Sequence, residues 1–134
     1  MTLYYLDTSA AIKLLREEEH SAAMAAFYDE AAVRADRFVS SDLLRIELQR
    51  AVTRAEPALL PEARALLSAM STIEIDEEIV QAAGSEPDRM LRTLDAIHLA
   101  SARAFGADLA ALITYDDRLA QAAKDADIPV LVPR

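Results

Sequence analysis

The sequence has no cysteine, only two glycines and five prolines, and no long uninterrupted run of apolar residues. Without cysteine it can form neither a disulfide framework nor a thiolate metal site or nucleophile. No apolar run approaches the roughly 20 residues that cross a bilayer, and the N-terminus lacks the basic segment of a secretory signal. We therefore expect a cytoplasmic protein that does not contact membranes.

The composition is otherwise that of a helix-rich globular protein. Hydrophobic residues make up 53% of the 134 positions and charged residues 28%, a balance that favours folding over disorder. This length suits one domain spanning residues 1–134.

Positive charge is also scarce, because 23 acidic residues face 14 basic ones and the net charge is −9. Charge alone predicts no binding to nucleic acid, whose affinity normally comes from Lys and Arg on the phosphates. Twelve of the 14 basic residues are arginine, however, the side chain best suited to forked phosphate contacts. An acidic site filled by a metal ion would also cancel several negative charges.

Short apolar segments alternate with amphipathic ones along the whole chain. Strands are predicted at residues 3–6, 37–41, 72–75, 110–114 and 129–132. Helices are predicted at 10–15, 20–32, 43–54, 61–70, 77–83, from 91 or 93 to 105, and 117–125, with residues 84–88 as the clearest loop. This alternation predicts an α/β fold of three layers, a central parallel sheet flanked by helices on both faces.

Two carboxylates follow predicted strands directly. Asp7 leads from the first strand into a helix, and Asp116 does the same after the fourth strand. In open parallel sheets, ligands gather beyond the carboxyl ends of the strands where the strand order reverses. Asp7, Asp116 or Asp117 could equally well cap the helix that follows, so this pattern leaves both interpretations open.

Two further carboxylates fall on apolar helix faces. Glu47 lies at helical spacing from Leu43, Leu44 and Ala51, where it would be buried unless it reached water or paired with Arg50 or Arg54. Asp95 shares a face with apolar residues, and its alternative is a cap on a helix starting at Ala96.

Four acids from dispersed segments can converge only if a positive charge joins them, because clustered carboxylates raise one another's pKa. The candidate ligands are Asp7, Glu47, Asp95 and Asp116. An all-oxygen set favours Mg²⁺ or Mn²⁺ over Zn²⁺ and predicts metal-assisted hydrolysis of a phosphodiester. His98 could act as an acid or base, but a lone helical histidine is more often a packed or supporting residue, so we leave it outside the catalytic set.

Four motifs contain these acids: LDTSA at residues 6–10, SDLLRIEL at 41–48, LDAIHLA at 94–100 and TYDDRL at 114–119. Their order and spacing resemble the PIN-domain family, in particular the VapC-type toxins of bacterial toxin–antitoxin pairs. The likeness covers residues 3–132, and the combination is far more specific than any one motif.

The resemblance implies a PIN fold and Mg²⁺- or Mn²⁺-dependent endonucleolytic cleavage of RNA. The same four acids would be catalytic and metal-binding, with Thr114 and Thr8 or Ser9 as polar supports and Asp117 as an uncertain one. It also implies a homodimer and a cognate VapB-type antitoxin. We expect that antitoxin to dock near the N-terminus, around Ile12, Leu15, Ala22, Ala26 and Phe27; these residues could instead face the core or a dimer interface.

Rival interpretations are other proteins with acidic sites. A phosphotransfer receiver domain would need a lysine after a late strand, but Lys13 and Lys124 both fall in predicted helices. A phosphohydrolase with Asp7 as nucleophile would usually carry a second Asp two residues on, where this chain has Ser9. An inactive binding module of the same fold is the third alternative, and the intact set of acids argues against it.

Overall fold

A computed structural model describes residues 2–134 and contains five strands and seven α-helices within that range. The strands are β1 (Leu3–Leu6), β2 (Arg37–Ser41), β3 (Ser71–Ile73), β4 (Leu109–Ile113) and β5 (Val130–Leu131). The α-helices are α1 (Thr8–Lys13), α2 (Ser21–Val33), α3 (Asp42–Ala55), α4 (Leu60–Ala69), α5 (Glu77–Gly84), α6 (Thr93–Ala104) and α7 (Asp117–Asp125). Short 3₁₀ turns at Pro57–Leu59 and Gly106–Asp108 precede α4 and β4.

The strands form one sheet in the order β3-β2-β1-β4-β5, and each neighbouring pair is parallel. The chain first builds outward from β1 through β2 to β3, then crosses back to add β4 and β5 on the other side of β1. The order therefore reverses between β1 and β4, which is the position where open parallel sheets bind ligands.

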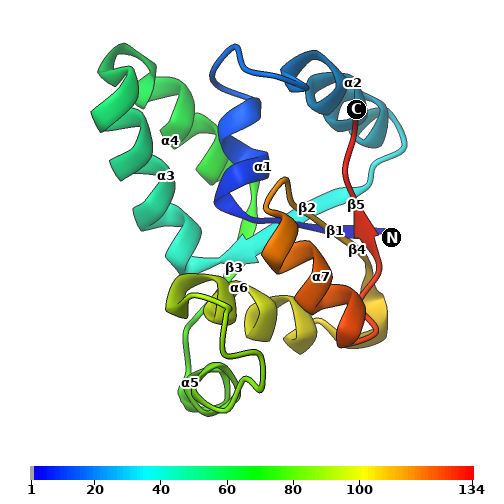
Figure 1. The fold of residues 1–134 in the computed structure, drawn as a ribbon. Coiled ribbons are helices and arrows are strands. Elements are labelled where there is room, and N and C mark those ends of the chain that lie inside the picture. Colours follow the sequence, from blue (N-terminus) through cyan, green and yellow to red (C-terminus); the bar gives the residue numbers. More distant parts are fainter. Residues whose placement is uncertain (1) are drawn as a thin grey trace.

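Helices cover both faces of this sheet, as the alternation of segments predicted. In the orientation of Figure 1, α1 to α4 lie above the sheet and α5 to α7 below it. Successive residues of β1 point to opposite faces: Leu6 belongs to the core under α1 to α4, whereas Tyr5 belongs to the core against α6 and α7. The expected three-layer α/β fold is confirmed.

Most element boundaries match the sequence prediction to within two residues. The largest differences are at α1, which spans Thr8–Lys13 rather than 10–15, and at the third strand, which runs over Ser71–Ile73 rather than 72–75. The third strand lies at the edge of the sheet, and Ile75, beyond its end, is exposed. The alternation of apolar residues in the sequence therefore continues past the last residue that pairs with β2. Gly84 closes α5 instead of opening the loop, while Gly106 ends α6 as expected, with the positive φ of 61° that a glycine accepts readily.

No helix in residues 2–134 combines the length and the apolar character that crossing a bilayer would take.

Candidate functional site

Asp7 occupies the reversal point of the sheet. It directly follows β1, and its backbone N–H donates to the carbonyl of Ile113, the last residue of β4. Its side chain is only 3% exposed. Oδ1 accepts hydrogen bonds from Ser9 Oγ at 2.7 Å and from the backbone N–H of Ala10 at 2.9 Å, so Asp7 does cap α1.

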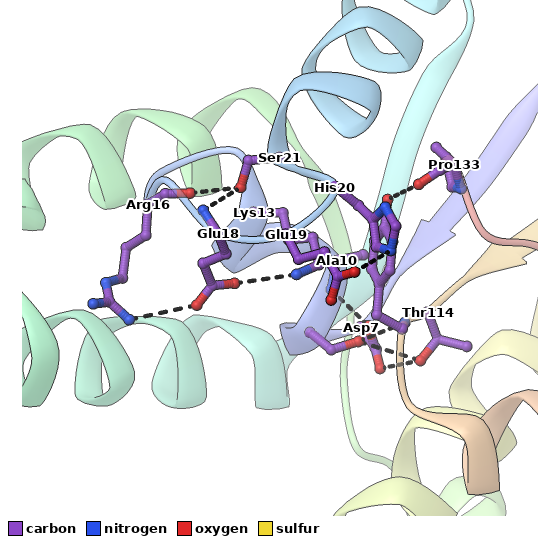
Figure 2. A network of polar contacts seen from close by, with 12 residues as sticks. Asp7, Ala10, Lys13, Arg16, Glu18, Glu19, His20, Ser21, Thr114 and Pro133 are labelled. Carbon is purple, nitrogen blue, oxygen red and sulfur yellow. Dashed lines mark hydrogen bonds and ion pairs between the residues drawn. The ribbon is translucent and has the colours of Figure 1, made fainter.

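The other oxygen of Asp7 points to the neighbouring strand end. Asp7 Oδ2 accepts a hydrogen bond of 2.6 Å from Thr114 Oγ1, a contact shown in Figure 2. Burial raises the pKa of Asp7, although the charge of His98 and the bonds from Thr114 and Ser9 act in the opposite direction. A charged carboxylate at this position is costly in the absence of a cation.

Asp116 is linked to Asp7 by hydrogen bonds to the same residue, Thr114. Its backbone N–H donates to Thr114 Oγ1 at 3.0 Å, which joins the loop after β4 to Asp7. Asp116 Oδ1 accepts from the N–H groups of Arg118 and Leu119 at 2.9 and 3.0 Å and so caps α7. The capping interpretation is thus right for both strand-end acids.

Glu47 reaches the same region from the second turn of α3, which begins directly after β2. Its Oε1 accepts hydrogen bonds of 2.7 Å from Thr8 Oγ1 and from His98 Nε2. Burial alone would raise the pKa of Glu47, but the bonds from His98 and Thr8 outweigh burial and lower it. Among residues 2–134 its one ion-pair partner is His98, so the alternative pairing with Arg50 or Arg54 is wrong.

Asp95 lies in the first turn of α6, a helix that leads into β4 and so begins near the carboxyl edge of the sheet. The helix starts at Thr93 rather than Ala96, and Arg92 is its N-terminal flanking residue; the capping interpretation of Asp95 is therefore wrong. Burial raises the pKa of Asp95, and the negative charges of Asp116, Asp7 and Glu47 raise it further. The charges of the other three acids therefore reach Asp95.

Only some of the carboxylate oxygens of these acids are occupied by hydrogen bonds. In the described part of the chain, all the bonds to Glu47 fall on Oε1 and all the side-chain bonds to Asp116 fall on Oδ1. Asp7 Oδ2 accepts from Thr114 alone, so one of its two lone-pair positions is open. Each of these three side chains is therefore held by hydrogen bonds and still has a lone pair free to bind a cation. A hard cation requires such oxygen ligands.

No three His, Asp or Glu side chains within residues 2–134 already surround a common point at metal-ligand distances. An ion would therefore have to draw the carboxylates together against their mutual repulsion. The donor set, all carboxylate oxygen, fits Mg²⁺ or Mn²⁺ and offers nothing that would favour a soft metal.

One wall of the site is built around Tyr115, between Thr114 and Asp116. Its N–H donates to Ser9 Oγ at 2.8 Å and its hydroxyl donates to the carbonyl of Pro133 at 2.7 Å. Lys13 Nζ lies 4.8 Å from the centre of the Tyr115 ring, and the His20 ring stacks on it at 6.0 Å. Figure 2 shows Lys13 also reaching Glu18. These contacts fix the loop that carries Thr114 and Asp116.

The polar residues proposed as supports have separate positions. Thr8 contacts Glu47, whereas Ser9 and Thr114 contact Asp7. Asp117 begins α7 with an exposed side chain, and no side-chain hydrogen bond to it is found in residues 2–134.

Sequence reasoning missed the direct bond from His98 to Glu47 and the bond from Tyr5 to His98. The spacing of His98 three residues after Asp95 was a signal for the first contact, but none in the local sequence pointed to Tyr5.

Comparison with known proteins identifies the family and the fold. The family model described as PIN domain matches residues 4–125. Ribonuclease VapC35 of Mycobacterium tuberculosis is 41% identical over 133 residues, covering 98% of this chain and 97% of the relative.

Two solved structures share the fold at lower identity. VapBC2 from Rickettsia felis bound to a DNA fragment has a TM-score of 0.75 at 14% identity, covering 98% of this chain and 99% of that one. A toxin–antitoxin complex from Klebsiella pneumoniae has a TM-score of 0.63 at 22% identity, covering 98% of each. The matching family model and the high identity to VapC35 over almost the whole length show that this chain belongs to the PIN-domain family, among its VapC proteins.

Proposed function

We propose that this protein is an endoribonuclease and the toxin of a toxin–antitoxin pair, with Asp7, Glu47, Asp95 and Asp116 as its catalytic metal ligands. The observation that carries the proposal is the placement of these acids around the carboxyl edge of the sheet, with Asp7 at its reversal point. There, Asp95 experiences the charges of the other three while hydrogen bonds orient Asp7, Glu47 and Asp116. The relative VapC35 of this protein bears the name ribonuclease.

Mg²⁺ or Mn²⁺ is the cofactor that the site would take. When bound, such an ion polarises a phosphodiester and assists attack by water. The chain's own part is to hold the ligands: Thr114 and Ser9 fix Asp7, Thr8 and His98 fix Glu47, and the first turn of α7 fixes Asp116. The cation would also reduce the local negative charge that otherwise repels RNA.

A cleavage assay with matched variants tests the proposal. Purified protein should cut RNA with Mg²⁺ or Mn²⁺ and stop when the metal is chelated. Asp95→Asn should abolish cleavage, whereas Asp108→Asn should not, because Asp108 is exposed and precedes β4 at the opposite edge of the sheet. Cleavage that survives both chelation and Asp95→Asn would reject the site.

The proposed antitoxin would cover α1 and α2. Ile12, Leu15 and Phe27 are partly buried and pack against the core. They therefore offer a docked antitoxin less exposed surface than the sequence predicted. Ala22 and Ala26 are exposed. Beside them lies a hollow of about 340 Å³, lined mainly by apolar residues that include Leu14, Leu15, Ala25, Tyr28 and Leu66. This surface suits the apolar side chains of a docked segment.

Homodimer formation and a cytoplasmic location complete the proposal. An RNA-cleaving toxin acts where RNA is available. Exposed apolar side chains at Val80, Met90 and Leu94, on and after α5, provide surface that a second copy could cover. Light scattering of the purified protein would measure the oligomeric state directly.

A further inference from the structure

A buried chain of hydrogen bonds leads from the core to the acidic site. Tyr5 is fully buried in β1 and His98 is 2% exposed in α6. The Tyr5 hydroxyl lies 2.6 Å from His98 Nδ1, and His98 Nε2 lies 2.7 Å from Glu47 Oε1. Both imidazole nitrogens are therefore used, one toward the core and one toward a proposed metal ligand.

The direction of the second bond follows from the chemistry of its partners. An ionised carboxylate can only accept, so Nε2 must carry the proton that it shares with Glu47. A phenol carries its proton at neutral pH, so the Tyr5 hydroxyl can donate to Nδ1. If the imidazole were instead doubly protonated, Nδ1 would donate to the phenol oxygen, and Nε2–H would still donate to Glu47.

Glu47 is the proposed ligand with the longest side chain, and it has the most rotational freedom to lose. Thr8 and His98 both donate to Oε1, which holds that oxygen and leaves Oε2 without a partner among the described residues. A histidine that served packing alone would need no acceptor in the site, since a leucine or phenylalanine would fill the same space.

We propose that His98 is a positioning residue, which holds Oε1 of Glu47 so that Oε2 is presented to the divalent cation. The inference rests on the proposed function, because it gives Glu47 the role of a metal ligand. The Tyr5 hydroxyl occupies Nδ1 on the far side of the ring, and Nε2 fixes the carboxylate. Neither residue touches the RNA or the reacting atoms.

Two substitutions of His98 separate positioning from packing. The amide nitrogen of Gln reaches about as far as Nε2, so His98→Gln keeps a donor for Glu47 and loses the partner of Tyr5. The amide of Asn reaches only as far as Nδ1, so His98→Asn keeps the Tyr5 partner and loses the donor. Each variant sacrifices one buried hydrogen bond, which makes their costs in stability comparable.

The measurement is Mn²⁺ affinity by electron paramagnetic resonance, without RNA. Loss of such supporting partners typically weakens metal binding by about 10–100-fold, so His98→Asn should weaken it by that factor while His98→Gln stays within about threefold of the parent. Equal affinity for all three proteins, or equal loss in both variants, would overturn the positioning role. A parent that binds no Mn²⁺ would overturn the proposed function itself.

A second measurement needs no variant that could fail to fold. The ¹⁵N chemical shifts and couplings of the His98 ring in the parent protein report which nitrogen carries a proton. The proposal requires a proton on Nε2; an Nε2 without one would overturn it even if the Mn²⁺ site proved correct.

Discussion

Asp7 both caps a helix and, in our proposal, binds the catalytic ion, and two substitutions can separate these roles. Asp7→Asn keeps an oxygen for the bonds from Ser9 and Ala10. Its amide can donate to Thr114 Oγ1, while the Thr114 hydroxyl can turn toward Ser9 Oγ, 3.3 Å away. Asp7→Ala loses all of these bonds. Only the negative charge distinguishes Asp7→Asn from the parent.

The structure gives opposite expectations for the stability of the two variants. Loss of the cap costs about 1 kcal/mol and loss of a charged hydrogen bond about 1.5–3 kcal/mol, so we expect Asp7→Ala to destabilise the fold by about 2.5–4 kcal/mol. For a chain of this length, 1 kcal/mol corresponds to about 4 °C in Tm. The Tm of Asp7→Ala should therefore fall by roughly 10–16 °C.

Asp7→Asn should be at least as stable as the metal-free parent at neutral pH, because burial raises the pKa of Asp7 and its ionised form destabilises the fold. The advantage should be present above the pKa of Asp7 in the fold. It should vanish as the pH falls below the ordinary carboxyl range, where the parent carboxyl is protonated in both states. Calorimetry with EDTA between pH 3 and 8 measures both trends.

RNA cleavage then decides the catalytic role. Both Asp7 variants should lose it, although only one is less stable. If folded Asp7→Asn protein cleaves RNA at the parent rate, the residue is a cap and the metal-ligand argument is refuted. If Asp7→Asn is inactive but has lost as much stability as Asp7→Ala, the hydrogen-bond accounting is wrong.

Three further predictions follow from the site and its surroundings. Asp95→Asn should raise the Tm of metal-free protein at pH 7, since repulsion and burial raise the pKa of Asp95; saturating Mg²⁺ should shrink or reverse that difference by stabilising only the parent, as parallel melts would show. Thr114→Val should lower stability by about 1.5–3 kcal/mol and weaken Mn²⁺ binding, because it removes the donor to Asp7 Oδ2; chemical unfolding and metal titration measure the two effects, and unchanged affinity would contradict the second. Ala26→Arg should reduce inhibition by the cognate antitoxin by at least about tenfold without changing cleavage, whereas the exposed control Ala110→Arg should leave inhibition unaltered.

Much of the fold could be predicted because each segment's periodicity agrees with its final environment. Residues 37–41 and 117–125 have the predicted boundaries, since a buried strand and a strongly amphipathic helix leave little ambiguity. The predicted end of a strand was less accurate where pairing with the neighbouring strand, and not the alternation of apolar residues, determines it. In β3 the alternation continues through Ile75, although pairing with β2 ends at Ile73.

The site was predictable only in part. Acids placed after strands or on apolar faces stand out, because an unpaired carboxylate is costly there. Partners from distant segments do not stand out: Thr8 and Glu47 are 39 positions apart, and Tyr5 and His98 are 93 positions apart. Nothing local distinguishes Tyr5 from any other aromatic residue in a buried strand, so its polar contact becomes visible only when β1 and α6 pack together.

The sequence left capping and metal binding open for Asp7 and Asp116, and the two oxygens of a carboxylate allow one side chain to do both. A helix that starts at the carboxyl edge of a parallel sheet needs an acceptor for its first N–H groups, and an acid meets that need with Oδ1 alone. The same bond fixes the side chain, so the direction of the second oxygen is set by the fold and not by rotamer freedom. Capping is therefore compatible with the metal-ligand role that we propose for Asp7 and Asp116, because it occupies one oxygen and orients the other.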